Sequence, residues 1–487
     1  MKRYTIDPIT RLEGHGKIEI FCNDDGEVEN VYFQVPELRG FEKFCEGRPV
    51  EELAQIVTKI CGVCPGCHHM ASGKAADAVY GIEIPPTARK LRELFYMAHF
   101  IHSHIAHFYA LAAPDFVVGP TADPAERNIL GVIAKVGKEV GTEVIKQRRL
   151  AQEIQAMLGG HQTHVVMNIP GGVRKGMTKE QQDDVIERAK GFIEFSKFSL
   201  KIFNDVVLGN NDYVNLIVDG PYNLKIHSMG LVDENNKVNF YNGKVRVVDT
   251  EGKELYKYAA NEYRDFVEER VEPWSYLKFP YLKKKGWNGF NEGPDSGVYH
   301  ATPLSRLNAA DGMATPLAQA EYEKMYKTLG GKPVHSTLAM HWARLVELLY
   351  SAEHCLELAQ DPEITGKEIR VLPEKVIGEG VGIVEAQRGT LTHHYWTDER
   401  GIVTKVNIIV GTTNNNAAIC MSLKKAAQKI IKKGITVDSG VLNMIEMAFR
   451  AYDPCFSCAT HSLPGHMPME VVFKNTKGEI IRILARR

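Results

Sequence analysis

Two pairs of cysteines carry the clearest chemical signal in the sequence. Cys61 and Cys64 lie in "KICGVCPGCHHMASG", and Cys455 and Cys458 lie in "DPCFSCATH". A C-x-x-C spacing lets two thiolates converge on one metal from a single turn of the chain. Two such pairs make a four-thiolate site, which suits zinc, an iron–sulfur cluster or nickel. The sequence therefore predicts a soft-metal site that joins two distant parts of the chain.

The separation of the pairs bears on the kind of metal site. Structural zinc sites usually close short loops, with their ligand pairs within some tens of residues, whereas here most of the chain separates the pairs. A structural zinc clip is therefore less favoured, but it stays open as an alternative. A thioredoxin-like redox pair is weaker still, because neither pair lies in a βαβ context.

Composition excludes several classes of protein. The net charge is −1, so no basic excess predicts binding to nucleic acid. The nine cysteines are odd in number and scattered, which argues against a disulfide framework. The N-terminal stretch lacks the apolar core of a signal peptide, and no apolar run is long enough to span a membrane. We expect a cytoplasmic protein.

The elements that must position these cysteines can be read from the hydrophobic pattern. The first 35 residues alternate around a turn at Asp24-Asp25-Gly26, which predicts a β-hairpin. A second hairpin is predicted with its turn at Asn242-Gly243, and a third around Asn475–Gly478. Further strands are expected within 382–396 and 402–413. Helical patterns occupy six stretches: 50–112, 124–158, 178–207, 315–329, 335–360 and 439–450.

These elements predict an α+β fold in which a bundle of long buried helices carries small peripheral β-sheets. We expect residues 1–487 to form one integrated unit. Its segments are a β-rich N-terminal part (1–50), a helical part (51–211), a β-rich insertion-like part (212–300) and a part with helices and strands that ends in the second cysteine motif (301–461).

Five blocks occur in a recognisable order: "RLEGHGKIEI", "ELRGFEKFCEGRP", "ICGVCPGCHHMAS", "EAQRGTLTHH" and "DPCFSCATH". Together they resemble the large, catalytic subunit of a [NiFe]-hydrogenase, and the soluble cytoplasmic multi-subunit group (NAD(P)-, F420- or viologen-linked) in particular. The resemblance implies reversible heterolytic activation of H2 to two protons and two electrons. It implies a buried nickel–iron centre whose iron carries carbon monoxide and cyanide.

By the same resemblance, the four cysteines hold the two metals in different ways. The first cysteine of each pair, Cys61 and Cys455, is terminal on nickel, and the second of each pair, Cys64 and Cys458, bridges nickel and iron. Soft thiolates suit both metals. Cys67, one further step along the first motif, is interpreted as a small buried residue.

The resemblance assigns catalytic and supporting roles to further residues. Glu13, in "RLEGH", matches a glutamate that relays protons from the thiolate of Cys455. Arg388, in "EAQRG", matches an arginine over the open metal position, although Gln387 replaces the usual proline before it. The supporting residues are three: His68, which hydrogen-bonds a bridging thiolate, Asp115, an acid near the arginine, and Thr412, whose hydroxyl faces a cyanide ligand.

A second, isolated metal is implied near the same motifs. Glu42, the backbone carbonyl of Ile408 and His461 resemble the ligands of Mg²⁺ (or Fe²⁺), which prefers oxygen ligands and retained water. The family's maturation protease commonly cuts just after this histidine. We therefore expect cleavage between His461 and Ser462, which would release 462–487 as a cleavable C-terminal extension.

The electrons released from H2 need a route out of this chain. Five cysteines remain outside the two pairs, and they are too scattered for an iron–sulfur relay. The resemblance implies an obligate small subunit with Fe–S clusters, diaphorase or flavin/Fe–S subunits, and a soluble acceptor such as NAD(P), ferredoxin or F420. A maturation protease and nickel-insertion chaperones are further implied partners. The alternative is a non-catalytic, hydrogenase-derived scaffold subunit of an electron-transfer complex, and the four intact cysteines argue against it.

Overall fold

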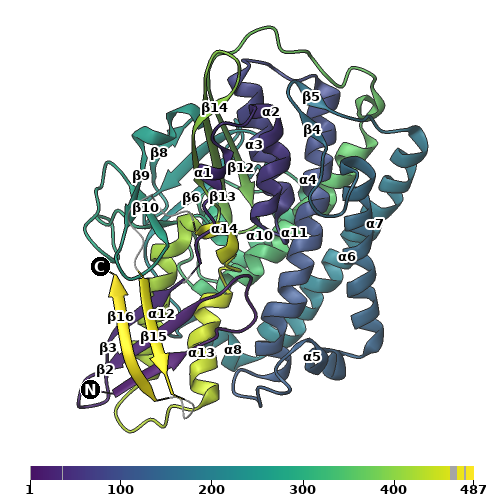
Figure 1. Ribbon diagram of the computed structural model, residues 1–487. Helices are drawn as coiled ribbons and strands as arrows, with labels where there is room; N and C mark the ends of the chain where they lie inside the picture. Colours follow the sequence, from purple (N-terminus) through teal and green to yellow (C-terminus); the bar gives the residue numbers. More distant parts are fainter. Residues whose placement is uncertain (1, 36, 461–468, 476–478, 487) are drawn as a thin grey trace.

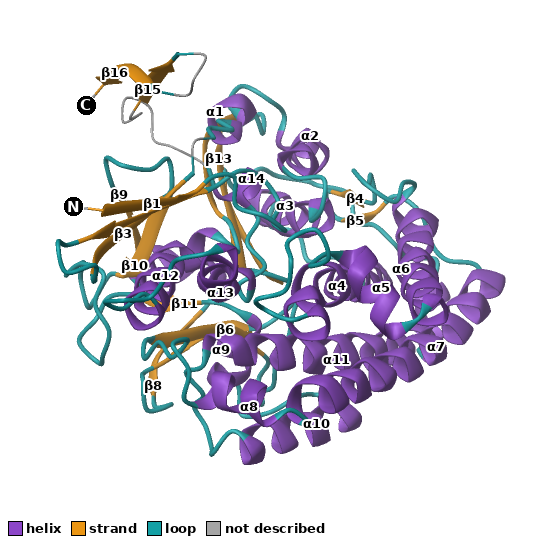
Figure 2. Ribbon diagram, turned by 90° about the horizontal axis from the view of Figure 1, so that it is seen from below, coloured by secondary structure: helices purple, strands orange, loops and turns teal. Residues whose placement is uncertain are grey.

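Long helices fill one side of the molecule, and small sheets surround the other side (Figures 1 and 2). The computed structural model describes residues 2–35, 37–460, 469–475 and 479–486. Helix α4 lies among the other long helices, and it is apolar on most of its surface, as the sequence predicts for a buried helix. The long helices are α3 (Pro65–Val79), α4 (Pro86–Ala106), α6 (Lys138–Gly159), α7 (Lys179–Phe203) and α11 (Met340–Gln360).

Shorter helices lie between these long helices and the strands along the chain. They are α1 (Phe41–Cys45), α2 (Val50–Ile56), α5 (Ile129–Val136), α8 (Asn211–Val218), α9 (Pro303–Ala309), α10 (Pro316–Thr328), α12 (Asn416–Ile430), α13 (Ser439–Arg450) and α14 (Phe456–Ala459). None of the helices among the described residues combines the length and apolar character needed to cross a bilayer.

Within the described residues the strands form six small sheets. The first is antiparallel, in the order β1 (Lys2–Ile6), β2 (Lys17–Cys22), β3 (Val28–Gln34). The largest has the order β11 (Tyr299–His300), β6 (His227–Val232), β7 (Lys244–Val248), β8 (Glu254–Tyr258). Three are two-stranded: β4 (Asn168–Ile169) with β5 (Gly172–Val173), β9 (Val267–Val271) with β10 (Lys278–Leu282), and β15 (Met469–Lys474) with β16 (Ile480–Arg486).

The sixth sheet contacts helix α3 and so positions the first cysteine pair. It is antiparallel, in the order β12 (Glu379–Ala386), β13 (Gly389–Thr397), β14 (Val403–Ile409), and Ala386 pairs with Gly389 across a two-residue turn. A Cβ atom on Gly380 or Gly382 would lie 2.3 or 2.0 Å from a carbonyl oxygen of α3. Glycine at both positions therefore lets the helix lie directly on the strand backbone.

The expected α+β architecture is confirmed, and so are most of the predicted elements. The hairpin at Asp24-Asp25-Gly26 joins β2 to β3, helix α13 covers 439–450, and a capping box at Thr178 opens helix α7. The single helix expected over 124–158 is wrong, because Gly137, at φ 95°, separates α5 from α6. Helices α9 and α12 were not predicted.

The prediction of a hairpin turn at Asn242-Gly243 is also wrong. The hairpin between β7 and β8 turns at 249–252 instead, where the Gly252 amide donates to the Asp249 carbonyl. The residues before Gly243 leave the sheet because Phe240 stacks on Phe100 of α4, with 4.0 Å between ring centroids. Burial of aromatic surface against the bundle therefore overrides the local turn signal.

Candidate metal centre

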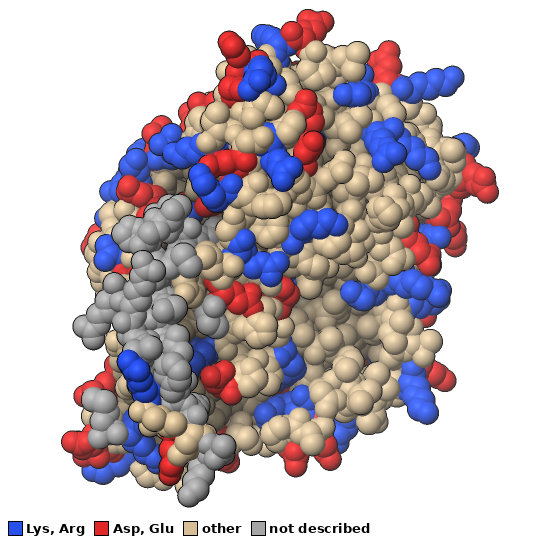
Figure 3. Space-filling view, in the orientation of Figure 1, with Lys and Arg blue, Asp and Glu red and all other residues tan. Residues whose placement is uncertain are grey.

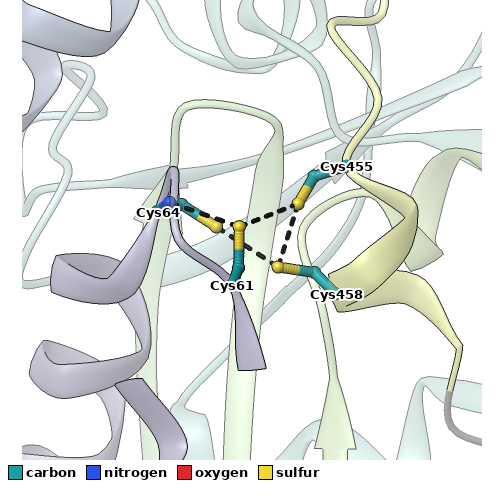
Figure 4. Close-up of side chains that lie close together, drawn as sticks. All are labelled: Cys61, Cys64, Cys455 and Cys458. Atoms are coloured by element: carbon teal, nitrogen blue, oxygen red, sulfur yellow. Dashed lines mark hydrogen bonds between the residues drawn. The ribbon is translucent and has the colours of Figure 1, made fainter. Parts of the chain in front are cut away.

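The four motif cysteines converge on one buried point, although they come from opposite ends of the chain (Figure 4). Their sulfur atoms all lie within 4.8 Å of one another. The closest approaches are 3.2 Å between Cys61 and Cys455, 3.3 Å between Cys64 and Cys458, and 3.0 Å between Cys455 and Cys458. Thus the first cysteine of one pair faces the first of the other, and the second faces the second.

Local backbone structure holds each pair. Cys64 is the N-cap of α3, and the amides of Val63 and Cys64 donate to the Cys61 sulfur at 3.2 and 3.4 Å. Cys455 is the N-cap of the short helix α14 and follows Asp453, which has a positive φ of 53°. Backbone amides and helix N-termini favour thiolate over thiol, so both loops suit metal ligation.

The pKa values of the four thiols indicate that a bound cation would stabilise the cluster. Hydrogen bonds from the Cys455, Cys458 and Cys64 thiols lower the pKa of Cys61 well below its ordinary value. Burial and the neighbouring thiols raise the pKa of Cys455 and Cys458. Without metal, Cys61 is thus the favoured thiolate, while Cys455 and Cys458 remain protonated. All four cysteines can be thiolates together only when bound metal balances their charge. The donor set fits soft or borderline metals such as nickel and iron.

Glu13 lies directly against this cluster. The Cys455 thiol donates to Glu13 Oε2 at 2.9 Å, and the Ser457 amide donates to the same oxygen at 3.1 Å. The two segments are also joined through their backbones, because the Phe456 amide donates to the Glu13 carbonyl at 3.0 Å. Gly14, at φ 86°, allows this approach, since its Cβ would lie 2.9 Å from the Ser457 nitrogen. Burial and the charge of Cys61 raise the pKa of Glu13.

Arg388 occupies the turn between β12 and β13, beside the cysteines. Its Nη2 lies 3.0 Å from Asp453 Oδ2, and its Nη1 donates to Ser103 Oγ at 3.4 Å. Burial opposes its charge, but Asp453 and the nearby cysteines hold its pKa above the ordinary value. Sequence reasoning missed Asp453, although it lies only two residues before the second C-x-x-C motif.

Asp115 lies in an ion-pair network of its own. Asp115 is buried, but it does not pair with Arg388; Asp453 is the carboxylate that does so among the described residues. Asp115 instead binds Arg11 Nη2 at 2.5 Å and Arg450 Nη1 at 2.9 Å. These two guanidiniums come from the N-terminal segment and helix α13, so Asp115 joins those elements rather than lining the cysteine cluster.

His68, Thr412 and Gln387 each contact one of the motif cysteines or the neighbouring Cys67. His68 Nε2 is 3.4 Å from the Cys458 sulfur, and Thr412 Oγ1 accepts from the Cys455 amide at 3.1 Å. The Cys67 thiol donates to the Gln387 side-chain oxygen at 3.0 Å, so the residue that replaces proline is tied to helix α3.

Glu42 lies in a separate polar cluster next to β14. Its Oε1 accepts from the Ile408 amide at 2.8 Å, and Lys278 Nζ lies 3.4 Å away. Lys278 is shared with Glu269, at 3.5 Å, and burial raises the pKa of both glutamates. Sequence reasoning did not anticipate Lys278 or Glu269. His461 and Ser462 lie outside the described residues.

Comparisons with known proteins agree with this geometry. The profile of the nickel-dependent hydrogenases matches residues 39–135 and 141–461, and a HoxL-like profile matches residues 3–38. The chain belongs to the nickel-dependent hydrogenase family. It is a hydrogenase large subunit, an oxidoreductase acting on H2, as the sequence motifs predict. The buried four-cysteine cluster is suited to a metal site, in agreement with the nickel dependence of this family.

Individual relatives of this hydrogenase large chain extend over nearly its whole length. An F420-non-reducing hydrogenase iron-sulfur subunit of Archaeoglobus profundus is 47% identical over 99% of both chains. The beta subunit of the NAD-reducing hydrogenase HoxS of Cupriavidus necator is 35% identical over 100% of both chains. Among solved structures, an NAD⁺-reducing [NiFe]-hydrogenase in the H2-reduced state superposes with a TM-score of 0.89 at 36% identity, covering 95% of this chain and 100% of that chain.

Proposed function

We propose that this subunit catalyses reversible cleavage of H2 at a nickel–iron centre held by its four buried cysteines. The observation that carries the proposal is the convergence of four sulfurs within 4.8 Å, with a glutamate in contact with one of them. The bound centre would supply the redox-active metals at which H2 is polarised and split. The protein supplies the ligands, a proton acceptor and fixed charge around them.

The contacts support different roles for the two cysteines of each pair. Cys61 and Cys455 face each other, and Glu13 contacts Cys455, which suits terminal ligands of nickel that exchange protons. Cys64 and Cys458 face each other, and His68 contacts Cys458, which suits ligands shared between nickel and iron.

We propose that Glu13 moves the proton. During H2 oxidation its Oε2 accepts a proton from the Cys455 sulfur, and during H2 formation it returns that proton. A raised pKa serves both directions, because the carboxyl can then change protonation state closer to neutral pH. The hydrogen bond from the Ser457 amide keeps the same oxygen in place in both states.

Arg388 and Thr412 are proposed to line the part of the pocket that would hold the iron. The salt bridge to Asp453 holds the Arg388 guanidinium beside the cysteines, where its charge orients the site and offsets the thiolates. The Thr412 hydroxyl oxygen accepts from Cys455, so its proton stays available for an acceptor such as a cyanide ligand. Iron-bound carbon monoxide and cyanide are the diatomic ligands that we propose.

The polar cluster at Glu42 is proposed to bind Mg²⁺ or Fe²⁺. Two partly buried glutamates, Glu42 and Glu269, share the single ammonium of Lys278, so the cluster holds excess negative charge that a divalent cation would balance. Glu42, the Ile408 carbonyl and His461 are the proposed protein ligands.

Electrons are proposed to leave through a small subunit that carries Fe–S clusters. The four-cysteine cluster is the one group of potential metal ligands of this kind among the described residues, so this part of the chain offers no relay. An open groove beside the Cys61 loop offers a docking surface: it includes Arg39, whose guanidinium donates to the Ile60 carbonyl, and the exposed Phe44. On the face drawn in Figure 3, charges of both signs lie around the edge and uncharged residues fill much of the middle.

The acceptor beyond that small subunit is proposed by analogy with the relatives. Their names describe NAD reduction in one case and a hydrogenase that does not reduce F420 in the other. We propose a soluble acceptor such as NAD(P) or ferredoxin, with F420 less favoured, reached through diaphorase or flavin/Fe–S subunits in the cytoplasm.

Maturation is proposed to end with cleavage between His461 and Ser462, after nickel-insertion chaperones have loaded the site. In support of this, the family profile ends at residue 461. Intact mass spectrometry of active enzyme should show a large subunit that lacks 462–487. A full-length mass in active enzyme would contradict the cleavage.

The proposed function is tested by metal analysis and infrared spectroscopy of the purified complex. We expect nickel, and absorption bands from iron-bound carbon monoxide and cyanide. Cys455→Ser should abolish nickel binding and H2 oxidation, whereas Cys355→Ser, a buried cysteine far from the cluster in sequence, should retain both. Zinc without these bands would indicate a structural site, and a complex without nickel would indicate a scaffold subunit.

A further inference from the structure

His68 is the first member of a chain of four buried side chains. Its Nδ1 lies 3.1 Å from His393 Nε2, and His393 Nδ1 lies 2.6 Å from the Tyr395 hydroxyl. The Tyr395 hydroxyl donates to Ser72 Oγ at 2.8 Å. All four side chains are fully enclosed. The chain therefore connects the Cys458 sulfur, through His68 Nε2, to the interface between α3 and the β12–β13–β14 sheet.

The chain depends on the match between a helix and a strand. His68 and Ser72 are four residues apart on α3, a rise of about 6 Å along one helix face. His393 and Tyr395 are two residues apart on β13, a rise of roughly 6.6 Å on one strand face. Because α3 packs directly on this sheet (Figure 1), His68 meets His393 and Ser72 meets Tyr395.

The direction of each hydrogen bond in this series follows from its last member, the bond between Tyr395 and Ser72. Tyr395 gives its proton to Ser72, so its oxygen accepts from His393 and the Nδ1 of His393 carries the hydrogen. In a neutral ring the Nε2 of His393 is then an acceptor, and it accepts from the Nδ1–H of His68. The hydrogen bond from Tyr395 to Ser72 therefore determines which nitrogen of His68 bears this hydrogen.

We propose that His393 and Tyr395 are positioning residues that fix the ring orientation of His68 and hold a hydrogen on its Nδ1, so that its Nε2 faces the Cys458 sulfur and accepts from it while Cys458 is a thiol. This inference rests on the proposed function for the role of Cys458 as a metal ligand. Here His393 and Tyr395 would act on the electronic properties of the metal through His68, which contacts the ligand Cys458.

The tautomer is tested in the metal-free full-length chain by NMR of ¹⁵N-labelled histidine rings. The His68 signals are assigned by their loss in His68→Gln. We expect a protonated Nδ1 on His68, and we expect this signal to shift or disappear in Tyr395→Phe. Tyr109→Phe is the matched control, because Tyr109 also forms a buried hydrogen bond to a serine hydroxyl, 2.9 Å from Ser199. A protonated Nε2 with an unprotonated Nδ1 in the wild-type ring would overturn the proposal.

The effect on the metal centre is tested by infrared spectroscopy of the complete enzyme. His393→Phe and Tyr395→Phe should shift the carbon monoxide and cyanide bands, while Tyr109→Phe should not. His393→Gln should restore the wild-type bands, because its amide oxygen can occupy the place of the ring Nε2 as an acceptor. Unshifted bands in both phenylalanine variants would refute the proposal. Absence of these bands from wild-type enzyme would instead refute the nickel–iron centre, and the NMR result would still decide the tautomer.

Discussion

Replacement of Glu13 by glutamine is the sharpest test of the catalytic assignment. The amide is nearly isosteric and its oxygen can still accept from the Ser457 amide, so the contact between the N-terminal segment and α14 should survive. It cannot take a proton from Cys455, which lies 2.9 Å away. Positioned acid–base groups typically contribute 10² to 10⁴ in rate. We therefore expect H2 oxidation to fall by about 10² to 10⁴, or about 2.7 to 5.4 kcal/mol in barrier.

Glu13→Asp separates the effect of position from the effect of charge. One methylene fewer withdraws the carboxylate by roughly 1.5 Å, which takes it out of hydrogen-bonding range of the Cys455 sulfur. We expect a rate between those of wild type and Glu13→Gln. Glu19→Gln is the matched control, because Glu19 lies in the same N-terminal segment but pairs with Lys17 and Arg3 in the first sheet.

The assay combines H2 oxidation, nickel content and pH dependence. Burial and the charge of Cys61 raise the Glu13 pKa, so as pH falls the carboxylate is lost at a higher pH than for an ordinary glutamate. H2 oxidation, which needs the carboxylate as acceptor, should therefore decline on the acid side at that raised pKa, and the decline should be absent in Glu13→Gln. Wild-type rates in Glu13→Gln at full nickel content would refute the proton-transfer role.

Two further predictions concern stability and the second metal. Asp115→Asn removes the carboxylate that Arg11 and Arg450 share, although Arg450 keeps its ion pair with Glu446, and we expect the urea unfolding free energy to fall by about 3 to 5 kcal/mol. Burial alone would raise the pKa of Asp115, but the two guanidiniums lower it in the folded protein. The ionised Asp115 therefore stabilises the fold fully above the unfolded-state pKa. This stabilisation is lost as the pH falls through the folded-state pKa. The variant should thus lose less stability in acid, and parallel curves would refute this. Glu42→Gln should remove Mg²⁺ or Fe²⁺ but retain nickel. The control Glu46→Gln, at an exposed ion pair with Lys43, should retain both metals. Unchanged metal content in Glu42→Gln would exclude Glu42 as a ligand of the second metal.

Motifs located the cysteine cluster well, because ligand chemistry demands particular residue types at fixed spacing. Cys61, Cys64, Cys455 and Cys458 meet as expected, and Glu13 and His68 each contact a sulfur. Helices with long periodic patterns were also predictable, since burial of one face follows directly from the sequence.

Pairing partners were harder to predict, because they depend on how distant elements pack. Asp115 and Asp453 are both acids in recognisable contexts, yet only the folded chain reveals that Asp453 pairs with Arg388 and Asp115 with Arg450. Similarly, nothing local in the sequence indicates that Phe240 stacks on Phe100 instead of joining a strand. Tertiary packing decides both cases.

The distance along the chain between the two halves of the cluster has a consequence for biosynthesis. Cys61 and Cys455 touch in the folded protein but are 394 residues apart in the sequence. At elongation rates of about 5 to 20 residues per second, the second half emerges roughly 20 to 80 s after the first. Throughout that interval Cys61 and Cys64 exist as a dithiol without partners, which can bind zinc but cannot assemble a two-metal site. Discrimination between metals must therefore be made after the last ligand has left the ribosome, by whatever delivers nickel.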